Sequence, residues 1–414
     1  MTFKVKTKGQ NEGEKLLVPK LRFKEFKNEW NEITLKKLLS FKNGINGDKD
    51  SYGYGIKYIS VGDILNNTYI TYDKIKGLID INDKTLKENS VEYGDMVFQR
   101  SSETFNDIGQ ANVYLDKKQI ATFGGFVIRG KKIGNYNPLF FNYLLKSPCN
   151  RKKVIVKGAG AQHYNISQEE LEKIKVNFTV EKEQVKIANL FYSLDKKIEL
   201  QQRKIEALKI YKTGLFNKIY KEKLNDIKES KLREYAYLQG GYAFKSELFS
   251  KKGTPIIRIA NINENIVDLK DVVFYDKEIP INFKFEINTG DILIAMSGAT
   301  TGKIGIYKEK MKSYLNQRVG KIVLKRKDMI YSYLYFLFEL SSYNMQLNTK
   351  LVAGAQPNIS PTDIENLKFK IPSIKLQEHI ANIVMNINKK LEIEGNKLQE
   401  LNELKKGLLQ KMFI

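Results

Sequence analysis

The residues best suited to chemistry lie in one loop rich in glycine and hydroxyl groups, Ser297-Gly298-Ala299-Thr300-Thr301-Gly302-Lys303. It approaches the pattern of a phosphate-binding loop, in which four residues separate two glycines and a Ser or Thr follows the lysine. Here three residues separate the glycines and Ile304 follows Lys303, so the magnesium ligand is missing. Such a small, donor-rich loop is able to approach a DNA backbone or base edges closely. The alternative is a tight turn whose hydroxyl groups are satisfied internally.

Little else in the sequence supports catalysis. Only two histidines occur, His163 and His379, and neither falls opposite a histidine in the internal repeat described below. The single cysteine, Cys149, belongs to no metal-ligand spacing and is expected to act as a small buried apolar residue. The glycines at 158 and 160 do not complete a dinucleotide fingerprint, and no Asn or Asp precedes a Pro-Pro-Tyr or Pro-Pro-Phe. We therefore expect no catalytic site and no metal site in this chain.

Net charge gives the strongest compositional signal. The 414 residues include 70 Lys and Arg against 47 Asp and Glu, a formal net charge of +23. This predicts a polyanionic partner, nucleic acid rather than a membrane surface, because the basic residues are spread along the chain. The alternative is a lysine-rich chain that is basic without binding anything. No apolar run of transmembrane length occurs and the N-terminus lacks a signal-peptide core, so we expect cytoplasmic localisation.

Two long helices are predicted to position these loops. Residues 183–227 contain no proline, and apolar residues recur there at the heptad period from Ile187 to Ile219. Residues 380–412 repeat the pattern at a fixed offset of 193 residues (380 − 187). Because the offset holds even where the seam is polar, it indicates an internal duplication.

The polar seam positions are Gln201, Lys212, Glu394 and Lys405. Antiparallel pairing would place Lys212 opposite Glu394 and Gln201 opposite Lys405, whereas parallel pairing would place the two lysines together. We therefore predict an antiparallel helix pair in which these residues set the register. Lys212→Glu should loosen the pair, and Glu394→Lys should restore it. The alternative is a lysine that lies in the seam by chance.

Each long helix follows a globule with the same order of elements. A short helix at Thr34–Leu39 and strands such as Met96–Arg100 lead to a helix at Pro138–Leu145, whose counterpart is Ile330–Leu340. The expected fold class is α/β (mixed α+β), with two homologous globules and two long antiparallel helices. The globules differ in most polar residues, as recognition of two different targets would require. The predicted segments are a disordered polar tail (1–18), a first globule (19–180), a first long helix (181–229), a second globule (230–373) and a second long helix (374–414).

The residues that frame both globules resemble those of the specificity subunit of type I restriction–modification enzymes, over roughly residues 19–414. The resemblance rests on PKLRF at 19–23 with Trp30, GDMVF and GDILI, SGATTGKIG, GAGAQHYNIS and GAQPNIS, EQVKIANLF and QEHIANIV, and helix ends in Gly-Leu-Phe and Gly-Leu-Leu.

The resemblance implies a DNA-binding subunit of a host-defence system, in which two target-recognition domains each recognise one half of a split sequence. Two methyltransferase subunits that carry S-adenosylmethionine, and two ATP-dependent translocase/endonuclease subunits that need magnesium, are the implied partners. A helix from Ile187 to Ile219 would span roughly 50 Å, which suits half-sites about one DNA turn apart or slightly more.

Within each globule we expect lysines and loop amides to hold phosphates, and Arg, Asn, Gln, Ser and Thr to contact base edges. The candidates in the first globule are Lys42, Asn43, Arg100, Ser101, Ser102, Gln162 and Tyr164. Those in the second are Lys245, Arg258, Ser297, Thr300, Thr301, Lys303, Arg318 and Gln356. Competing hypotheses are a cryptic nuclease or methyltransferase, a stand-alone DNA-binding protein, and a coiled-coil adaptor, for which the large differing globules would be superfluous.

Overall fold

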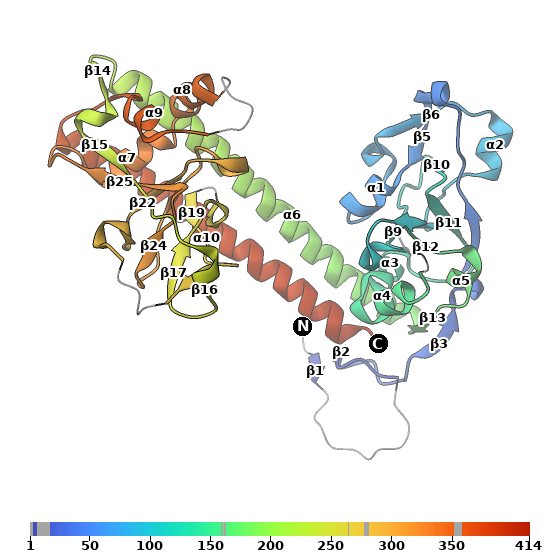
Figure 1. Cartoon of the computed structure of the whole chain (residues 1–414). Coiled ribbons are helices and arrows are strands. Elements are labelled where there is room, and N and C mark those ends of the chain that lie inside the picture. The colour runs from blue at the N-terminus through green and yellow to red at the C-terminus, as the bar shows by residue number, and fades with distance from the viewer. Residues whose placement is uncertain are drawn as a thin grey trace. The chain divides into compact units, whose positions relative to one another are not determined.

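The computed structural model describes residues 3–5, 17–158, 160, 163–263, 265–276, 281–351 and 358–414. The chain divides into two compact units: unit 1 contains the residues up to Gln202 together with Asn396–Ile414, and unit 2 contains Arg203–Gly395. Both long helices, α6 (Glu181–Lys218) and α10 (Ile374–Met412), pass from one unit into the other (Figure 1). Each unit therefore contains one globule and a part of each helix.

Unit 1 is built on a four-stranded antiparallel sheet in the order β4 (Leu39–Asn43), β11 (Val127–Lys132), β7 (Met96–Gln99) and β9 (Ala111–Val113). A second sheet has the order β10 (Thr122–Phe123), β5 (Tyr52–Ile59) and β6 (Gly77–Ile79), with β5 and β10 parallel. The other strands are β1 (Phe3–Val5), β2 (Leu21–Phe23), β3 (Asn31–Thr34), β8 (Ser101–Ser102), β12 (Tyr164–Asn165) and β13 (Lys175–Phe178). The helices are α1 (Val61–Asn66), α2 (Asp83–Glu88), α3 (Pro138–Lys146), α4 (Pro148–Ile155) and α5 (Gln168–Glu172).

Unit 2 repeats the central arrangement in a six-stranded sheet. Its order is β15 (Ala236–Gly240), β25 (Val319–Leu324), β22 (Ile292–Ala295), β23 (Ile304–Ile306), β19 (Asn265–Val267) and β18 (Ile262–Asn263). A five-stranded sheet has the order β16 (Phe249–Ser250), β20 (Val273–Tyr275), β17 (Thr254–Ile257), β24 (Ser313–Leu315) and β21 (Glu286–Ile287). The remaining elements are β14 (Glu229–Lys231), β26 (Lys368–Lys370), α7 (Tyr331–Phe338), α8 (Ser341–Leu351) and α9 (Pro361–Glu365).

The core of unit 1 includes the C-terminal end of the chain. Met412 and Phe413 are buried, and the Phe413 ring lies 6.2 Å from the single tryptophan, Trp30, and 5.8 Å from Phe191 of α6. In unit 2 the end of α6 has the matching role, since Phe216 and Ile219 are buried against α7 and its neighbours. Each globule therefore packs against the start of its own long helix and the end of the other.

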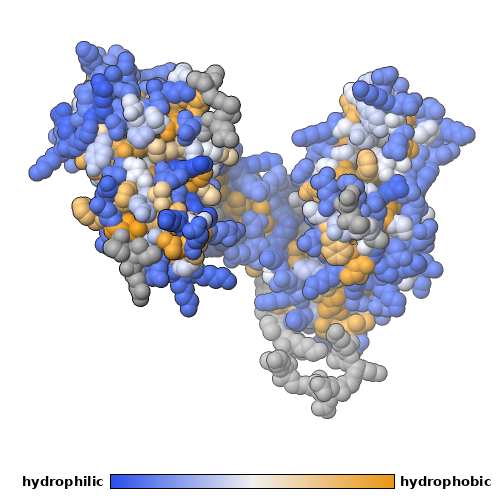
Figure 2. All heavy atoms as spheres, viewed as in Figure 1, coloured by the Kyte–Doolittle hydropathy of each residue, from blue (hydrophilic) through white to orange (hydrophobic). Residues whose placement is uncertain are grey.

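The predicted apolar seam of the two helices is confirmed. All the seam positions, from Ile187 to Ile219 and from Ile380 to Met412, are buried or half-buried in the unit to which they belong. The face seen in Figure 2 is largely hydrophilic, with hydrophobic patches on both globules. Burial of the seam explains why the heptad pattern appears in both copies of the repeat.

Local details differ from the expectations. The short helix predicted at Thr34–Leu39 is reduced to a 3-10 helix at Leu35–Lys37. β3 ends at Thr34 and β4 begins at Leu39, because these strands pair with β13 and β11. α6 ends at Lys218 and a π-helical turn, Ile219–Lys223, follows where the chain enters the second globule. Phe3–Val5 pair with β2, and residues 1, 2 and 6–16 of the predicted tail lie outside the described residues.

Candidate nucleic-acid interface

The central sheet of unit 1 ends in a tight turn that joins three loops. The Val127 N–H donates to the carbonyl oxygen of Gly124 (2.8 Å), and the Gly44 N–H donates to that of Val127 (3.0 Å). Arg100, the residue after β7, donates its N–H to the carbonyl oxygen of Phe126 (2.8 Å). A Cβ on Gly44 would lie 2.0 Å from the Gly124 carbonyl oxygen, so this close approach requires glycine. We call Arg100, Gly124–Phe126 and Gly44 the first turn edge.

Unit 2 contains the same backbone arrangement. The Val319 N–H donates to the carbonyl oxygen of Asn316 (2.8 Å), and the Met296 N–H donates to that of Arg318 (2.9 Å). A Cβ on Gly241 would again lie 2.0 Å from a carbonyl oxygen, that of Asn316. We call Met296, Asn316–Arg318 and Gly241 the second turn edge. The duplication therefore preserves the turn, two of its hydrogen bonds and its glycine.

The side chains on the two turn edges differ. Phe126 is 68% exposed, and its counterpart Arg318 is also exposed. Arg100 is exposed and its Nη1 donates to the Gly125 carbonyl oxygen (3.3 Å), whereas its counterpart Met296 is half-buried. Among the described residues, no hydrogen bond or ion pair holds the Arg318 guanidinium. The two turn edges thus share a backbone arrangement but differ in which of their positions are polar and which are apolar.

The other first-globule candidates lie close to this edge in the fold, with unequal freedom to bind. Asn43 is exposed at the end of β4, and Lys42 is half-buried with its ammonium donating to the Glu88 carbonyl oxygen (3.1 Å). Ser101 bonds to Asn165, and Ser102 is buried, where its hydroxyl accepts from Thr104. Tyr164 is half-buried with its ring 5.3 Å from that of Phe105. Gln162 lies outside the described residues.

In the second globule, two threonines of the hydroxyl-rich loop donate hydrogen bonds to backbone carbonyl oxygens. Thr300 Oγ1 donates to the Ile259 carbonyl oxygen (3.1 Å), and Thr301 Oγ1 donates to that of Gly298 (2.6 Å). Ser297 is buried, which leaves little of its side chain for a ligand. These contacts favour the alternative of an internally satisfied turn for Thr300 and Thr301, whereas the buried Ser297 hydroxyl has no hydrogen-bond partner among the described residues.

The side chains of the basic candidates in the second globule are exposed to solvent to different degrees. Lys245 is exposed and Lys303 is half-buried. Arg258 is half-buried and its Nη2 donates to the carbonyl oxygen of Asp271 (3.2 Å). Gln356 lies outside the described residues. Of the second-globule candidates, Lys245 and Arg318 are therefore the most open to an anionic partner.

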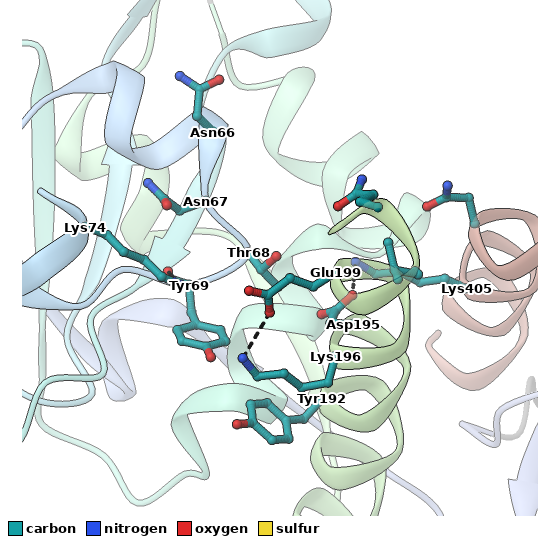
Figure 3. Close-up of a pocket in the computed structure, with 13 residues that line it drawn as sticks. Asn66, Asn67, Thr68, Tyr69, Lys74, Tyr192, Asp195, Lys196, Glu199 and Lys405 are labelled. Carbon is teal, nitrogen blue, oxygen red and sulfur yellow. Dashed lines mark hydrogen bonds and ion pairs between the residues drawn. The ribbon is translucent and has the colours of Figure 1, made fainter. Parts of the chain in front are cut away.

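A polar cluster joins the first globule to the long helices in unit 1. Tyr143 of α3 donates to Asp195 Oδ2 of α6 (2.6 Å), and the ammonium of Lys405 of α10 lies 2.6 Å from Asp195 Oδ1. Lys146, at the end of α3, donates to the carbonyl oxygen of Thr68 (2.8 Å). Figure 3 shows Lys405 and Asp195 meeting across the two helices beside a cavity of about 380 Å³, which Tyr69, Lys74 and Tyr192 also line.

Burial shapes the titration of this cluster. Burial, followed by the positive charge of Lys405, lowers the pKa of Lys146 to about 7, although Asp195 opposes the shift. Burial and the Asp195 carboxylate raise the pKa of Tyr143, so the hydroxyl group stays protonated and remains a donor. The cluster is therefore a structural junction held by one carboxylate between several cationic and hydroxyl donors.

Unit 2 builds the equivalent junction with its charges redistributed. At the offset of 193 residues, Lys146 corresponds to Glu339, Asp195 to Asn388, and Lys405 to Lys212. The Lys212 ammonium pairs with Glu339, which also accepts from Asn388 Nδ2 (3.4 Å). The carboxylate thus comes from the long helix in unit 1 and from the globule in unit 2. The offset relates the two junctions to each other, but neither pair follows from the sequence, because each contact depends on how the globule packs against the long helices.

The predicted partners of the register residues are corrected by these contacts. Lys212 pairs with Glu339 instead of Glu394, and Lys405 pairs with Asp195, six residues before the predicted partner Gln201. Glu394 pairs with Lys204 (2.8 Å), eight residues before Lys212. The antiparallel direction of the helix segments holds in each unit, but the observed pairs lie about two helical turns from the predicted register. Gln201 is half-buried.

Two glutamines that the sequence analysis also missed tie the long helices to their globules. Gln184 of α6 accepts from the Asn137 N–H (2.9 Å) and donates to the Thr179 carbonyl oxygen (2.7 Å). Gln377 of α10, at the same offset, accepts from the Ile330 N–H (3.1 Å) and donates to the Pro372 carbonyl oxygen (2.9 Å). The motifs EQVKIANLF and QEHIANIV therefore have the same structural role in both copies.

Three further observations concern the described residues alone. They contain no group of three or more His, Cys, Asp or Glu side chains placed to hold a metal ion. None of their helices is long and apolar enough to cross a membrane. Cys149 is half-buried rather than fully buried, with its Sγ 3.1 Å from the Ser147 hydroxyl.

Comparison with known proteins places this architecture among related chains. Residues 27–209 and 225–403 match the family described as type I restriction modification DNA specificity domain. The chain is 25% identical over 317 residues to the type I restriction enzyme MjaVIII specificity subunit of Methanocaldococcus jannaschii, covering 72% of this chain and 74% of that protein. It is 30% identical over 175 residues to the EcoBI specificity subunit of Escherichia coli, covering 39% of this chain and 35% of that protein.

The fold agrees with solved structures of low sequence identity. The crystal structure of a type I restriction–modification S subunit from M. genitalium superposes with a TM-score of 0.58 at 18% identity, covering 96% of this chain and 99% of that chain. A chain from a structural study of complex assembly and conformational transition in the type I R-M system gives the same TM-score at 12% identity, covering 92% and 96%.

Proposed function

The chain belongs to the type I restriction–modification DNA specificity family, and we propose that each of its globules recognises one half of a bipartite, gapped DNA target. The observation that carries this proposal is the pair of turn edges. They share backbone hydrogen bonds and a required glycine, yet expose Phe126 and Arg100 in one copy and Arg318 in the other. One frame with two different faces is suited to two different half-sites.

The net charge of +23 supports a polyanionic partner and predicts affinity that falls with added salt. Accessible cations such as Lys245 and Arg100 would contact phosphates or base edges around each turn edge. Because Thr300 and Thr301 already donate to backbone carbonyl oxygens, we assign the hydroxyl-rich loop a supporting role in shaping the surface.

We further propose that the paired helices set the gap between the half-sites and dock two methyltransferase subunits. Large apolar side chains remain exposed on them: Leu200 is 63% exposed in unit 1, and Ile210 is 67% exposed in unit 2. A helical partner surface would cover such residues. S-adenosylmethionine would then be bound by the methyltransferase subunits, and ATP and magnesium by two translocase/endonuclease subunits.

A methylome map tests the proposal. The chain would be expressed with the methyltransferase subunit encoded beside it, in a host without adenine methylation. Modified adenines confined to one gapped, two-part motif are the expected result. Absence of modification from a complex shown to assemble would contradict the assignment and favour a stand-alone DNA-binding protein or a coiled-coil adaptor.

A further inference from the structure

The third residue of each turn provides a sharper assignment, which rests on the proposed function. Phe126 and Arg318 occupy the same place, because each accepts a hydrogen bond at its carbonyl oxygen from the residue after the neighbouring strand, at 2.8 and 2.9 Å. Each also precedes the residue whose N–H closes the turn at 2.8 Å. Because the same two backbone hydrogen bonds fix each turn, the side chains of Phe126 and Arg318 start from equivalent backbone positions.

The neighbouring position carries the opposite kind of residue. Arg100 lies beside Phe126, whereas Met296 lies beside Arg318. Each turn edge therefore has one arginine and one large apolar residue, with their order reversed between the units. A single exposed phenylalanine needs no explanation by itself, but exchange of arginine and an apolar residue between two fixed positions changes what each edge can bind.

The chemistry of DNA edges matches this pair of residues. In the major groove, arginine forms two hydrogen bonds with O6 and N7 of guanine, and apolar side chains contact the 5-methyl group of thymine. Arg318 is exposed, and no other described side chain engages its guanidinium, so its donors are available for a base. Since Phe126 starts from the same backbone position, its ring should reach the same groove depth, where the thymine methyl group is the apolar feature.

We propose that the third turn residue is the base-reading residue at one equivalent position of each half-site: Arg318 bonds a guanine in the second half-site, and Phe126 contacts a thymine methyl group in the first. Insertion of the Phe126 ring between base pairs is the competing outcome.

The test uses the full chain assembled with its methyltransferase subunit. Motifs and affinities would be measured for the wild type, Phe126→Ala and Arg318→Ala, with Ile133→Ala and Arg326→Ala as controls at exposed positions of the same units. We expect Phe126→Ala to relax one thymine of the first half-site alone, and Arg318→Ala to relax one guanine of the second alone. The guanine preference should fall by about 5- to 140-fold.

Modified bases separate the contacts chemically. Deoxyuridine in place of the thymine removes only the methyl group and should weaken wild-type binding by about 3- to 5-fold, with no further loss for Phe126→Ala. 7-Deazaguanine should weaken the wild type and leave Arg318→Ala unchanged. Equal loss of affinity for all sequences would indicate phosphate contacts and overturn the inference. Insensitivity of the wild type to deoxyuridine, with Phe126→Ala still impaired, would indicate ring insertion and also overturn it.

These outcomes are distinct from failure of the proposed function. A wild type that methylates no bipartite motif would contradict the proposed function itself. A wild type with a clear bipartite motif, which both alanine variants leave unchanged, would overturn only the assignment of Phe126 and Arg318.

Discussion

The ammonium of Lys405, near the C-terminus, lies 2.6 Å from the carboxylate of Asp195, which is 210 residues earlier in the chain. In the second unit the corresponding lysine, Lys212, finds its carboxylate on the globule instead, at Glu339. The duplicated junction has therefore kept its lysine and one acidic partner while moving the acid between elements. This difference allows the equivalence of the two junctions to be tested by exchanging charges.

Asp195→Asn should destabilise unit 1, by about 3 kcal/mol, because it leaves Lys405 and Lys146 near each other without a carboxylate. The urea midpoint of Trp30 fluorescence measures this, since Trp30 is the single tryptophan and is buried in unit 1. Adding Lys146→Glu recreates the arrangement of unit 2 and should recover most of the loss. A double variant no more stable than Asp195→Asn would show that the two junctions are not equivalent.

The lowered pKa of Lys146 makes the stability of unit 1 depend on pH. Between about pH 7 and pH 10 the unfolded chain keeps a proton on Lys146 that the folded chain has released. The free energy of unfolding therefore rises with pH, by at most about 1.4 kcal/mol for each pH unit. Below about pH 7 both states are protonated and the penalty is fully present. Lys146→Met should remove this slope, because methionine has no ammonium group to titrate. The Thr68 carbonyl oxygen would keep its hydrogen bond from Asn142. Lys36→Met, at an exposed site, should retain it.

Charge reversal at Lys212 identifies its true partner. Lys212→Glu places two carboxylates together at a site where the side chains are only 13% and 4% exposed, and should lower the melting temperature of unit 2. Glu339→Lys should restore most of the stability by reversing the pair. Glu394→Lys, which the sequence pattern favoured, should fail to do so. Circular dichroism melting compares the three variants, and rescue by Glu394→Lys alone would refute the structural pairing.

The C-terminal residues should stabilise the first globule. Phe413→Ala removes a buried ring that contacts Trp30, Phe140 and Phe191, and should cost about 3–5 kcal/mol. Trp30 fluorescence in urea is again the measurement. Leu404→Ala, at a 52% exposed position on the same helix, should change the midpoint little. Equal midpoints for Phe413→Ala and the wild type would show that this end of α10 is not part of the core.

Adjacent glycines offer a matched test of the second turn edge. Gly241→Ala would place a Cβ 2.0 Å from the Asn316 carbonyl oxygen, whereas a Cβ on Gly240 would meet nothing within 4 Å. We expect Gly241→Ala to reduce methylation of the target at least tenfold by displacing the turn that carries Arg318. Gly240→Ala should have little effect. Methylation of a target plasmid by the assembled complex provides the comparison.

Several features could be predicted from the sequence because they repeat. The apolar seams from Ile187 to Ile219 and from Ile380 to Met412 follow from local periodicity, and the fixed offset indicates the duplication without any coordinates. The family resemblance rests on the same repeated motifs. Residue type alone identifies Arg100 and Arg318 as candidates, and both are exposed on the turn edges.

What the tertiary structure decided concerns partners far apart in the chain. Lys212 could not be assigned to Glu339 from a helical pattern, because that contact depends on how the globule packs against α6. Likewise, Phe126 is an unremarkable residue in the sequence, and it gains significance only when backbone hydrogen bonds place it where Arg318 lies in the other unit. Periodicity and repeats are properties of the chain itself, whereas the choice among alternative charge partners and exposed turns is made by packing.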